Sequence, residues 1–259
     1  MTSHYIAARE KLIAAFGEAG IRKGDTLLLH SDTDILAEFL PDGGTLDQFA
    51  LLEASLRDVL GAEGTLLVPT FTYSFCNGRR FDPAKRNSAV GLFTNYIRRR
   101  DDAHRSHHPV FSFAAIGKNA ADLTADVSVS GFGKGSIFER MTERGAKIAC
   151  FNIEFQECCT FVHYIEELHG VSYRYHKTFS GEIVIDGKPQ PTEAINYVRD
   201  LERNVESNFG AFASGLEERG LLKKTGLGSG FIQTYSCRET LEFGLQSLAE
   251  NPFVFLAYP

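Results

Sequence analysis

The sequence has no long apolar run, no excess of basic residues and no apolar segment near its start. No stretch of about 18 apolar residues occurs, so we expect no membrane span. The first 25 residues carry charges throughout and contain no apolar core of the signal-peptide type. The formal net charge is −6, which does not suit general nucleic-acid binding. We therefore expect a cytoplasmic protein with a small-molecule partner and no nucleic acid, and a homodimer stays open.

Cysteine is scarce, and no CxxC pair occurs among the five cysteines. They are Cys76, Cys150, Cys158, Cys159 and Cys237. Because the number is odd and two of them are adjacent, we interpret all five as reduced thiols. The sequence also lacks a GxGxxG after a strand, a P-loop, and a cluster of residues at metal-ligand spacing. We therefore predict no bound metal.

Predicted strands and helices alternate along the first 170 residues. Helical patterns cover residues 5–20 and 45–61, where Thr45 is a plausible N-cap and Gly61 a stop. Strands are predicted at "DTLLLHSD", "GTLLVPTFTYSF", "HHPVFSFAAIG" and "AKIACFNI". This alternation is typical of an α/β layered core with parallel strands. We expect a single domain over residues 1–259, with a more variable part from about residue 170.

The pattern changes after residue 170. "YRYHKTFSGEIVIDGKPQP" predicts a hairpin, since Asp186-Gly187 is a strong turn signal. Residues 192–220 are charged and are predicted to be helical. The last segment predicts a strand and then a helix that starts near Ser236 or Arg238.

"CTFVHYIEEL", residues 159–168, combines a hydroxyl, an imidazole and two carboxylates in one predicted helix. Residues three and four apart are neighbours on a helix, so His163 can reach Glu166 or Glu167. A carboxylate beside an imidazole fixes its tautomer and suits a general base. One alternative is a solvated helix face. Another is a cysteine hydrolase, in which Cys158 supplies a thiolate near His163.

Several stretches together resemble the aminoglycoside 3-N-acetyltransferases. They are "LLLHSD", "GTLLVPTFTYSF", "SAVGLFTNYIR", "RSHHPVFSFAAIG", "GKGSIFERM" and "CTFVHYIEE", which occur in this order. The resemblance implies a layered α/β/α sandwich distinct from the GNAT fold, and a CoA-dependent N-acyltransferase. Acetyl-CoA and the amine would bind side by side, and the amine would attack directly. In family terms His163 matches the catalytic histidine, Glu166 the carboxylate that orients it, and Thr160 the preceding threonine.

The expected chemistry assigns further residues. A protonated amine is no nucleophile, so a base must remove its proton during the attack on the thioester. The oxyanion needs donors, and the loop 70–72, with Thr72, follows a buried strand. "GKGS" before a helix offers backbone N–H groups to a phosphate. The residues that resemble the cofactor-binding segments are Ser31, Asp32, Thr33, Ser106, His108, Phe113, Lys134, Gly135 and Ser136.

The acceptor is expected to be a small-molecule amine of an amino sugar or an aminoglycoside, with Tyr73, Glu167, Tyr173 and Arg174 as substrate-binding residues. An aminoglycoside is a polycation and requires an acidic cleft, which glutamates at 154, 157, 166 and 167 can supply. The run "YRYHK" instead suits a nucleotide-linked amino sugar of surface polysaccharide biosynthesis. A non-catalytic CoA-binding protein is a further alternative.

Overall fold

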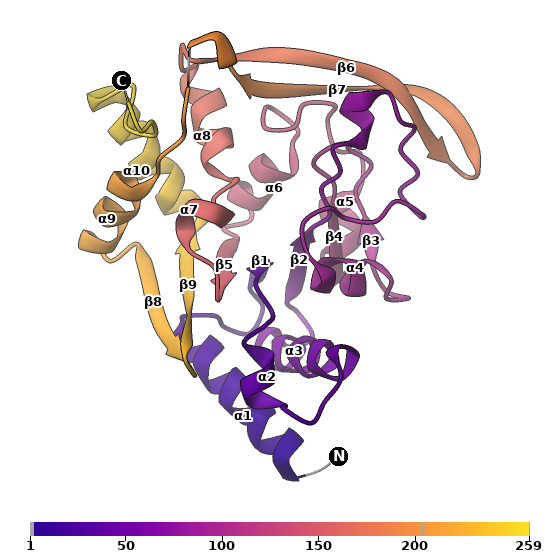
Figure 1. The fold of residues 1–259 in the computed structure, drawn as a ribbon, viewed down its shortest axis with the longest axis vertical. Helices are drawn as coiled ribbons and strands as arrows, with labels where there is room; N and C mark the ends of the chain where they lie inside the picture. The colour runs from indigo at the N-terminus through magenta and orange to yellow at the C-terminus, as the bar shows by residue number, and fades with distance from the viewer. Residues whose placement is uncertain (1–2, 204, 259) are drawn as a thin grey trace.

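The computed structural model describes residues 3–203 and 205–258, and Figure 1 shows its fold. Nine strands form one seven-stranded sheet, in the order β3-β4-β2-β1-β5-β9-β8, and a separate hairpin, β6-β7. The strands of the sheet are β1 (Thr26–Ser31), β2 (Thr65–Pro69), β3 (His104–Arg105), β4 (Phe113–Gly117), β5 (Lys147–Phe151), β8 (Leu222–Leu227) and β9 (Gly230–Ser236). The hairpin strands are β6 (Arg174–Ile185) and β7 (Lys188–Arg199).

The helices lie on both faces of the sheet. They are α1 (Ser3–Glu18), α2 (Leu36–Phe39), α3 (Thr45–Leu60), α4 (Leu92–Arg98), α5 (Ala120–Thr124), α6 (Ile137–Glu143), α7 (Phe155–Cys158), α8 (Val162–His169), α9 (Gly210–Glu218) and α10 (Cys237–Glu250). Two short 3-10 turns, η1 (Ser74–Asn77) and η2 (Leu201–Arg203), interrupt the loops. Within the described ranges, no helix has the length and apolar character needed to cross a membrane.

The predicted parallel sheet is only partly correct. β1 is parallel to both β2 and β5, as the alternation of strands and helices indicated. β4 is antiparallel to β2, and β9 is antiparallel to β5. Pro69, the last residue of β2, pairs with Phe113, the first of β4. The chain between them therefore returns to the same edge of the sheet, where β4 begins.

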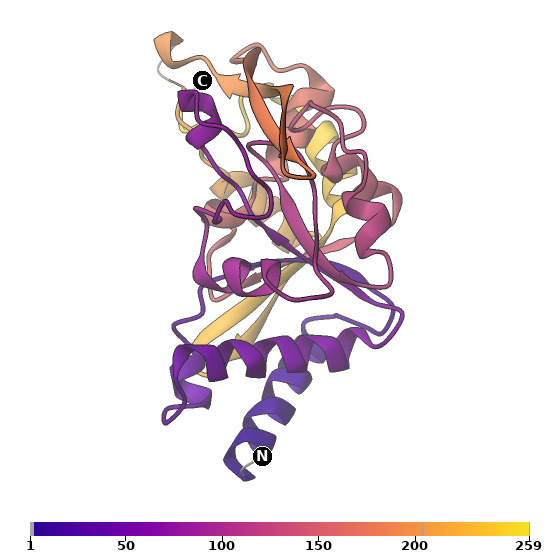
Figure 2. The same cartoon turned by 90° about the vertical axis from the view of Figure 1, so that its right-hand side faces the viewer.

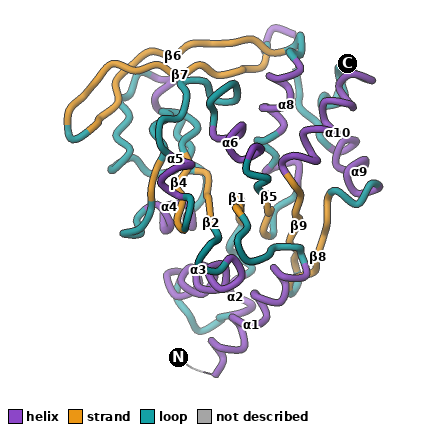
Figure 3. Tube along the Cα trace, turned by 180° about the vertical axis from the view of Figure 1, so that it is seen from behind, coloured by secondary structure: helices purple, strands orange, loops and turns teal. Residues whose placement is uncertain are grey.

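Alternation along the central strands builds two apolar layers. Successive side chains of a strand point to opposite faces, so Leu28 packs in one core cluster and Leu27 and Leu29 pack in the other. The first cluster lies against α6, α8 and α10, and the second against α1 and α3. Figures 1 to 3 show these helix layers on either side of the sheet. The architecture is a three-layered α/β/α sandwich, as predicted.

Local signals explain where α3 begins and ends. The N–H of Gly44 donates to Asp47 over 3.0 Å, so Gly44 rather than Thr45 is the capping residue. Gly61 ends the helix with a φ of 66°, which favours glycine.

The β6-β7 hairpin is the feature that the sequence predicted least well. Its turn is correctly placed, because Asp186 and Gly187 adopt φ values of 50° and 74°. The predicted helix over residues 192–220 is wrong in its first part, which forms the second strand of the hairpin, and right in its last part, which forms α9. The two strands pair from Arg174–Arg199 to the turn.

The hairpin lies at the end of the molecule opposite to α3 and the N-terminus (Figures 1 and 2). Ile183 and Ala194 anchor it in a small core cluster with Phe75 and Phe81. Gly181 permits this contact, because a Cβ at that position would lie 2.7 Å from the ring of Phe75. The hairpin is thus held against the loops that follow β2.

Candidate active site

A pocket of about 710 Å³ lies between the carboxyl ends of β2 and β5 and the inner side of the hairpin. Residues after β2, residues after β5 and the last part of β7 contribute its walls. Its lining includes Phe71, Tyr73, Cys76, Val110, Phe111, Phe132, Gln156, Thr160, His163, Arg174, Phe179, Asn196, Tyr197, Val198, Arg199, Leu201, Glu206, Ser207 and Phe209. The pocket holds the predicted base, His163, and the predicted Thr160 and Tyr73.

His163 is bound to a fully buried carboxylate. Its Nδ1 lies 2.7 Å from Oε2 of Glu166, whose side chain is 0% exposed, whereas the His163 side chain is 24% exposed. The structure therefore selects Glu166 and not Glu167 as the partner of His163. With Nδ1 engaged, Nε2 is the ring nitrogen left to exchange a proton.

Arg174 completes the group from the other side. Its Nε lies 2.7 Å from the same Oε2 of Glu166, and its side chain is 4% exposed. One of its NH groups also donates to the carbonyl of Tyr197 over 3.2 Å. Arg174, which we predicted to bind substrate, is among the residues that line the pocket, and its guanidinium neutralises Glu166. A buried carboxylate requires such a partner, because an isolated buried charge is strongly unfavourable.

The charges of this group set its protonation. Burial by itself raises the pKa of Glu166, but the hydrogen bond to His163 and the positive charges nearby hold it below its usual range. Burial lowers the pKa of His163, and the charges of Arg174 and Arg199 lower it further, while Glu166 acts in the opposite direction. His163 is therefore neutral at neutral pH and can accept a proton.

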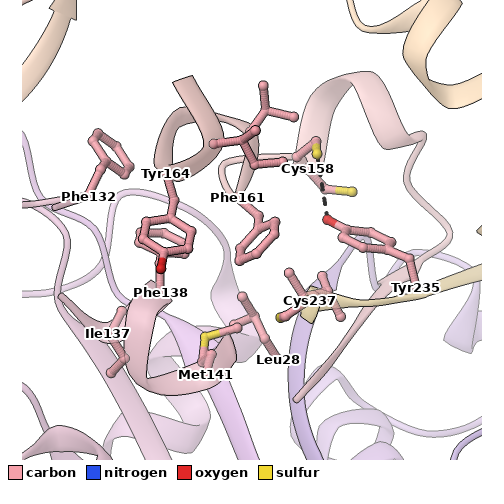
Figure 4. Packing of buried hydrophobic residues seen from close by; sticks show 14 of the residues in the cluster. Leu28, Phe132, Ile137, Phe138, Met141, Cys158, Phe161, Tyr164, Tyr235 and Cys237 are labelled. Atoms are coloured by element: carbon pink, nitrogen blue, oxygen red, sulfur yellow. Dashed lines mark hydrogen bonds between the residues drawn. The ribbon is translucent and has the colours of Figure 1, made fainter. Parts of the chain in front are cut away.

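Aromatic rings fix the position of the imidazole. The ring of Phe132 meets it edge-on at a centroid distance of 5.4 Å, and the ring of Phe209 lies 6.2 Å away. Below α8, Phe138, Phe161 and Tyr164 pack against one another in the core (Figure 4). The helix that carries His163 is thus mounted on a rigid apolar layer.

Of the four predicted substrate-binding residues, Tyr73 and Arg174 line the pocket, and Glu167 and Tyr173 do not. The carboxylate of Glu167 lies 3.1 Å from Nε2 of His176, and the hydroxyl of Ser130 donates to it over 3.4 Å. Tyr173 is 1% exposed and packs against Phe253. Neither is placed to touch a substrate in this structure.

Thr72 is not placed to stabilise an oxyanion. Its N–H donates to the carbonyl of Val110 over 2.9 Å, and its hydroxyl donates to that of Pro109 over 2.7 Å. Both donors are engaged within the protein, because the loop after β2 pairs with the loop before β4. Thr72 therefore has no free donor for the oxyanion, contrary to our expectation.

The residues predicted to bind the cofactor line neither this pocket nor the cleft described below. Ser106 is 1% exposed and accepts the N–H of Phe113, which is itself a core residue of β4. His108 accepts the N–H of Phe111 at Nδ1, and its Nε2 lies 3.1 Å from the carbonyl of Val129. Burial lowers the pKa of His108 to about 4. These side chains brace the loop before β4.

The remaining predicted cofactor residues have other partners. Ser31 and Thr33 are half-buried at the end of β1. Asp32 accepts a hydrogen bond from Asn152 over 3.1 Å and holds the end of β5.

In the "GKGS" segment, Lys134 is exposed. The N–H of Gly135 donates to Glu139 over 2.6 Å, and that of Ser136 donates to Gly133. Ser136 caps α6. The N–H groups of Gly133, Gly135 and Ser136 are thus used within the protein and are not available to a phosphate.

A second cleft, of about 1270 Å³, adjoins the pocket at Tyr73, which lines both. Its cationic lining residues are Arg80, Lys85 and Arg86, and its anionic ones are Asp82 and Asp186. The cleft runs between the loop 74–89 and the tip of the hairpin. Its cations suit a phosphorylated ligand.

The cysteine prediction is wrong for two of the five residues. Cys150 and Cys158 form a disulfide with an S–S distance of 2.07 Å. Cys159 is buried, which raises the pKa of its thiol to about 12. Cys76 is a free thiol that lines the pocket, and burial raises its pKa as well. Since Cys158 has no free thiol and burial disfavours the thiolates of Cys76 and Cys159, the described part of the site does not favour a cysteine hydrolase. Among the described residues no group of three or more His, Cys, Asp or Glu is arranged to hold a metal.

The family profile described as aminoglycoside 3-N-acetyltransferase matches residues 29–249, which is most of the chain. The chain belongs to the aminoglycoside 3-N-acetyltransferase family. The resemblance seen in the sequence is confirmed, and this member of the family is an N-acetyltransferase.

Relatives of this N-acetyltransferase include aminoglycoside N(3)-acetyltransferase VII of Streptomyces paromomycinus, which is 24% identical and covers 94% of the chain and 92% of the relative. Another is aminoglycoside N(3)-acetyltransferase III of Serratia marcescens, which is 26% identical and covers 81% of the chain and 91% of the relative.

Solved structures share the fold of this N-acetyltransferase. Aminoglycoside acetyltransferase AAC(3)-Xa superposes with a TM-score of 0.80 at 21% identity, over 93% of this chain and 92% of that one. AAC-IIIb, solved as a binary complex with CoASH, gives a TM-score of 0.79 at 20% identity, over 97% and 98% of the two chains. The predicted fold of the aminoglycoside 3-N-acetyltransferase type is confirmed.

Sequence reasoning missed several residues around the base of this N-acetyltransferase. Phe132 and Phe209 contact His163, and Asn196 and Arg199 line the pocket from β7. The signal for the last two was the hairpin turn at 186–187, because a long first strand needs an equally long partner. No local signal in the sequence marks the two phenylalanines as neighbours of His163.

Proposed function

We propose that the protein transfers the acetyl group of acetyl-CoA to the amine of an amino sugar, with His163 as the general base. One observation carries this proposal. The carboxylate of Glu166, buried and paired with Arg174, holds Nδ1 of His163 at 2.7 Å and so presents Nε2 as the proton acceptor. This arrangement orients a neutral imidazole at the wall of a pocket, which is what a general base requires.

The reaction is a direct transfer. The amine nitrogen attacks the thioester carbonyl carbon and forms the amide bond, while its proton moves to Nε2 of His163. The carbon–sulfur bond then breaks, and the proton passes to the leaving thiolate of CoA. Both substrates must be bound together, because Cys158 has no free thiol and burial disfavours the thiolates of Cys76 and Cys159, which leaves no activated thiol to carry the acetyl group between them. The rings of Phe132 and Phe209 limit water at the imidazole, which disfavours hydrolysis of the thioester.

Thr160 is the proposed partner of the developing oxyanion. It lines the pocket next to His163, and its hydroxyl makes no hydrogen bond within the described part of the chain. A hydroxyl of this kind can donate to the carbonyl oxygen of the thioester as negative charge develops there. It replaces Thr72, whose donors are engaged.

Acetyl-CoA fits the pair of adjoining clefts. Its phosphates need cations, and the cleft beside the pocket provides Lys85 and Arg86 together with Arg80. Arg80 pairs with Glu182 at 2.5 Å, and Lys85 lies 3.9 Å from Asp82. Because both cations are exposed to solvent, these pairs are weak and the cations can bind a phosphate instead. Tyr73 lies where the two clefts meet, on the way from the phosphates to His163.

The test measures release of free CoA thiol from acetyl-CoA with a panel of amines, alongside the intact mass of the enzyme. The proposal expects thiol release only when an amine is present, and no acetylated enzyme when it is absent. Lys85→Ala and Arg86→Ala together should raise the KM for acetyl-CoA with little change in kcat. Stable acetylation of the protein without an amine would contradict direct transfer, and no binding of acetyl-CoA would contradict the function itself.

A further inference from the structure

The charges that line the pocket of His163 do not match a polycationic acceptor. Its only lining carboxylate within the described ranges is Glu206, which is exposed at the rim. Glu166 is already paired with His163 and Arg174, and Glu167 with His176. A polyamine would need several carboxylates to offset the cost of removing its charges from water.

Arg199 is a cation without an anionic partner in this pocket. It lines the pocket from the end of β7. Its guanidinium donates to the carbonyl of Val205 over 3.3 Å and forms no ion pair with any described residue. Its charge lies close enough to His163 to lower the pKa of the imidazole. A positive charge beside the base repels a polycation and attracts an anionic group.

A second cation, Lys177, lies beside this wall without lining the pocket itself. Lys177 lies over the ring of Phe179, with its nitrogen 5.2 Å from the ring centroid, and Phe179 lines the pocket. Lys177 also forms no ion pair among residues 3–203 and 205–258. The hairpin thus carries one unpaired cation that lines the pocket, Arg199, and a second beside it, Lys177, against one lining carboxylate, Glu206; all three side chains are exposed.

The rest of the pocket suits the body of a sugar. Aromatic rings form a large part of its walls, and rings pack against the apolar face of a sugar. Asn196, which is 4% exposed, lines the pocket, and its Oδ1 has no hydrogen-bond partner in the described part of the chain. A buried polar atom without a partner is costly, and a substrate hydroxyl or amide that donates to it would remove that cost.

We propose that the acceptor is an amino sugar that carries a phosphate or carboxylate group, which Arg199 binds, and not a polycationic aminoglycoside. This proposal rests on the proposed function and specifies its acceptor. The Arg199 guanidinium holds the anionic group, the rings hold the sugar, and the amine is left facing Nε2 of His163. The amine then brings a single positive charge to the pocket.

The experiment compares kcat/KM for matched acceptors with saturating acetyl-CoA. Glucosamine and glucosamine 6-phosphate differ only by the phosphate, while glucosaminuronic acid tests a carboxylate and UDP-glucosamine a nucleotide diphosphate. Kanamycin is the polycation. The kcat/KM for the best anionic acceptor should exceed that for glucosamine and that for kanamycin by about 10-fold or more, which is the usual effect of one hydrogen bond to a charged group.

Variants test whether Arg199 causes the preference for an anionic acceptor. Arg199→Gln should lower kcat/KM for the best anionic acceptor by about 10- to 100-fold more than it lowers kcat/KM for glucosamine, which has no anionic group for the guanidinium to bind. Arg199→Glu should raise kcat/KM for kanamycin. Arg203→Gln is the matched control, since Arg203 also donates to a backbone carbonyl, that of Ser172, but does not line the pocket.

The outcomes separate this proposal from the function on which it rests. If acetyl-CoA does not bind, the proposed function fails. If kanamycin is acetylated with a higher kcat/KM than every anionic acceptor, the function stands and this proposal is overturned. If Arg199→Gln lowers kcat/KM equally for glucosamine and for glucosamine 6-phosphate, the proposal is also overturned. Calorimetry that detects none of the three anionic sugars bound to the acetyl-CoA complex would overturn it too.

Discussion

Arg174 is expected to be a positioning residue, and Arg174→Met tests this. Glu166 is 0% exposed and Arg174 4%, with 2.7 Å between them. Removing one partner of a buried ion pair typically costs about 3–5 kcal/mol, because the other charge stays buried and unpaired. Against the roughly 5–15 kcal/mol that stabilises an ordinary protein, this is a large share. Urea unfolding should therefore show a marked loss in the free energy of unfolding.

A second readout separates positioning from simple structural damage. The charge of Arg174 lowers the pKa of His163, so its removal leaves the opposing charge of Glu166 unbalanced. The pKa of His163 should then rise, and the acidic limb of the kcat/KM profile should move to higher pH. Purely structural damage would lower the whole profile without moving the limb.

The control for this prediction is the double variant Glu166→Gln/Arg174→Met, which removes both charges. It should recover much of the lost stability, since no unpaired charge remains. It should not recover turnover, because His163 has lost its carboxylate. If Arg174→Met unfolds at the same urea concentration as the wild type and keeps its pH profile, the role given to Arg174 is wrong.

Three further predictions concern the pH dependence of stability, the disulfide and the hairpin. Burial lowers the pKa of both His30 and His108 from 6.5 to about 4. Below pH 6.5 these two histidines take up protons in the unfolded chain but stay neutral in the native state, so the free energy of unfolding should fall between pH 6.5 and about pH 4, by up to roughly 3 kcal/mol for each histidine. Urea unfolding of His108→Gln at several pH values should show a smaller fall over this range than the wild type. A fall equal to that of the wild type would contradict the prediction. Cys158→Ser should lower the melting temperature and keep kcat, because no thiol takes part; loss of kcat with the fold intact would contradict direct transfer. Gly181→Val should raise the KM values by displacing the hairpin, since its Cβ would meet Phe75; unchanged kinetics would show that the hairpin does not shape the pocket.

The core of the fold and the base were open to prediction because their signals are local. Apolar runs marked the buried strands, and the spacing of His163 and Glu166 on one helix face survives in the structure as a direct contact. Gly61 and the turn at 186–187 impose backbone conformations that few other residues adopt. Features of this kind depend on neighbours in the chain.

The rest depended on contacts between distant segments. Residues 192–199 of β7 were predicted to be helical, yet pairing with β6 makes them part of a strand and delivers Asn196 and Arg199 to the pocket. His108 looked like a ligand-binding histidine, but its ring is buried and braces a loop. Arg174 was predicted as a substrate contact; it does line the pocket, and its pairing with the buried Glu166 could not be foreseen from the sequence. No spacing rule in the sequence reveals which of these groups the fold buries.

The most direct test of the central claim is the turnover number of His163→Ala with saturating acetyl-CoA and the best acceptor. If Nε2 of His163 takes the proton of the attacking amine, kcat should fall by about 10²- to 10⁴-fold, the usual contribution of a general base. The affinity for acetyl-CoA, measured by calorimetry, should change little. Full turnover in His163→Ala, with the fold and acetyl-CoA binding intact, would contradict the account.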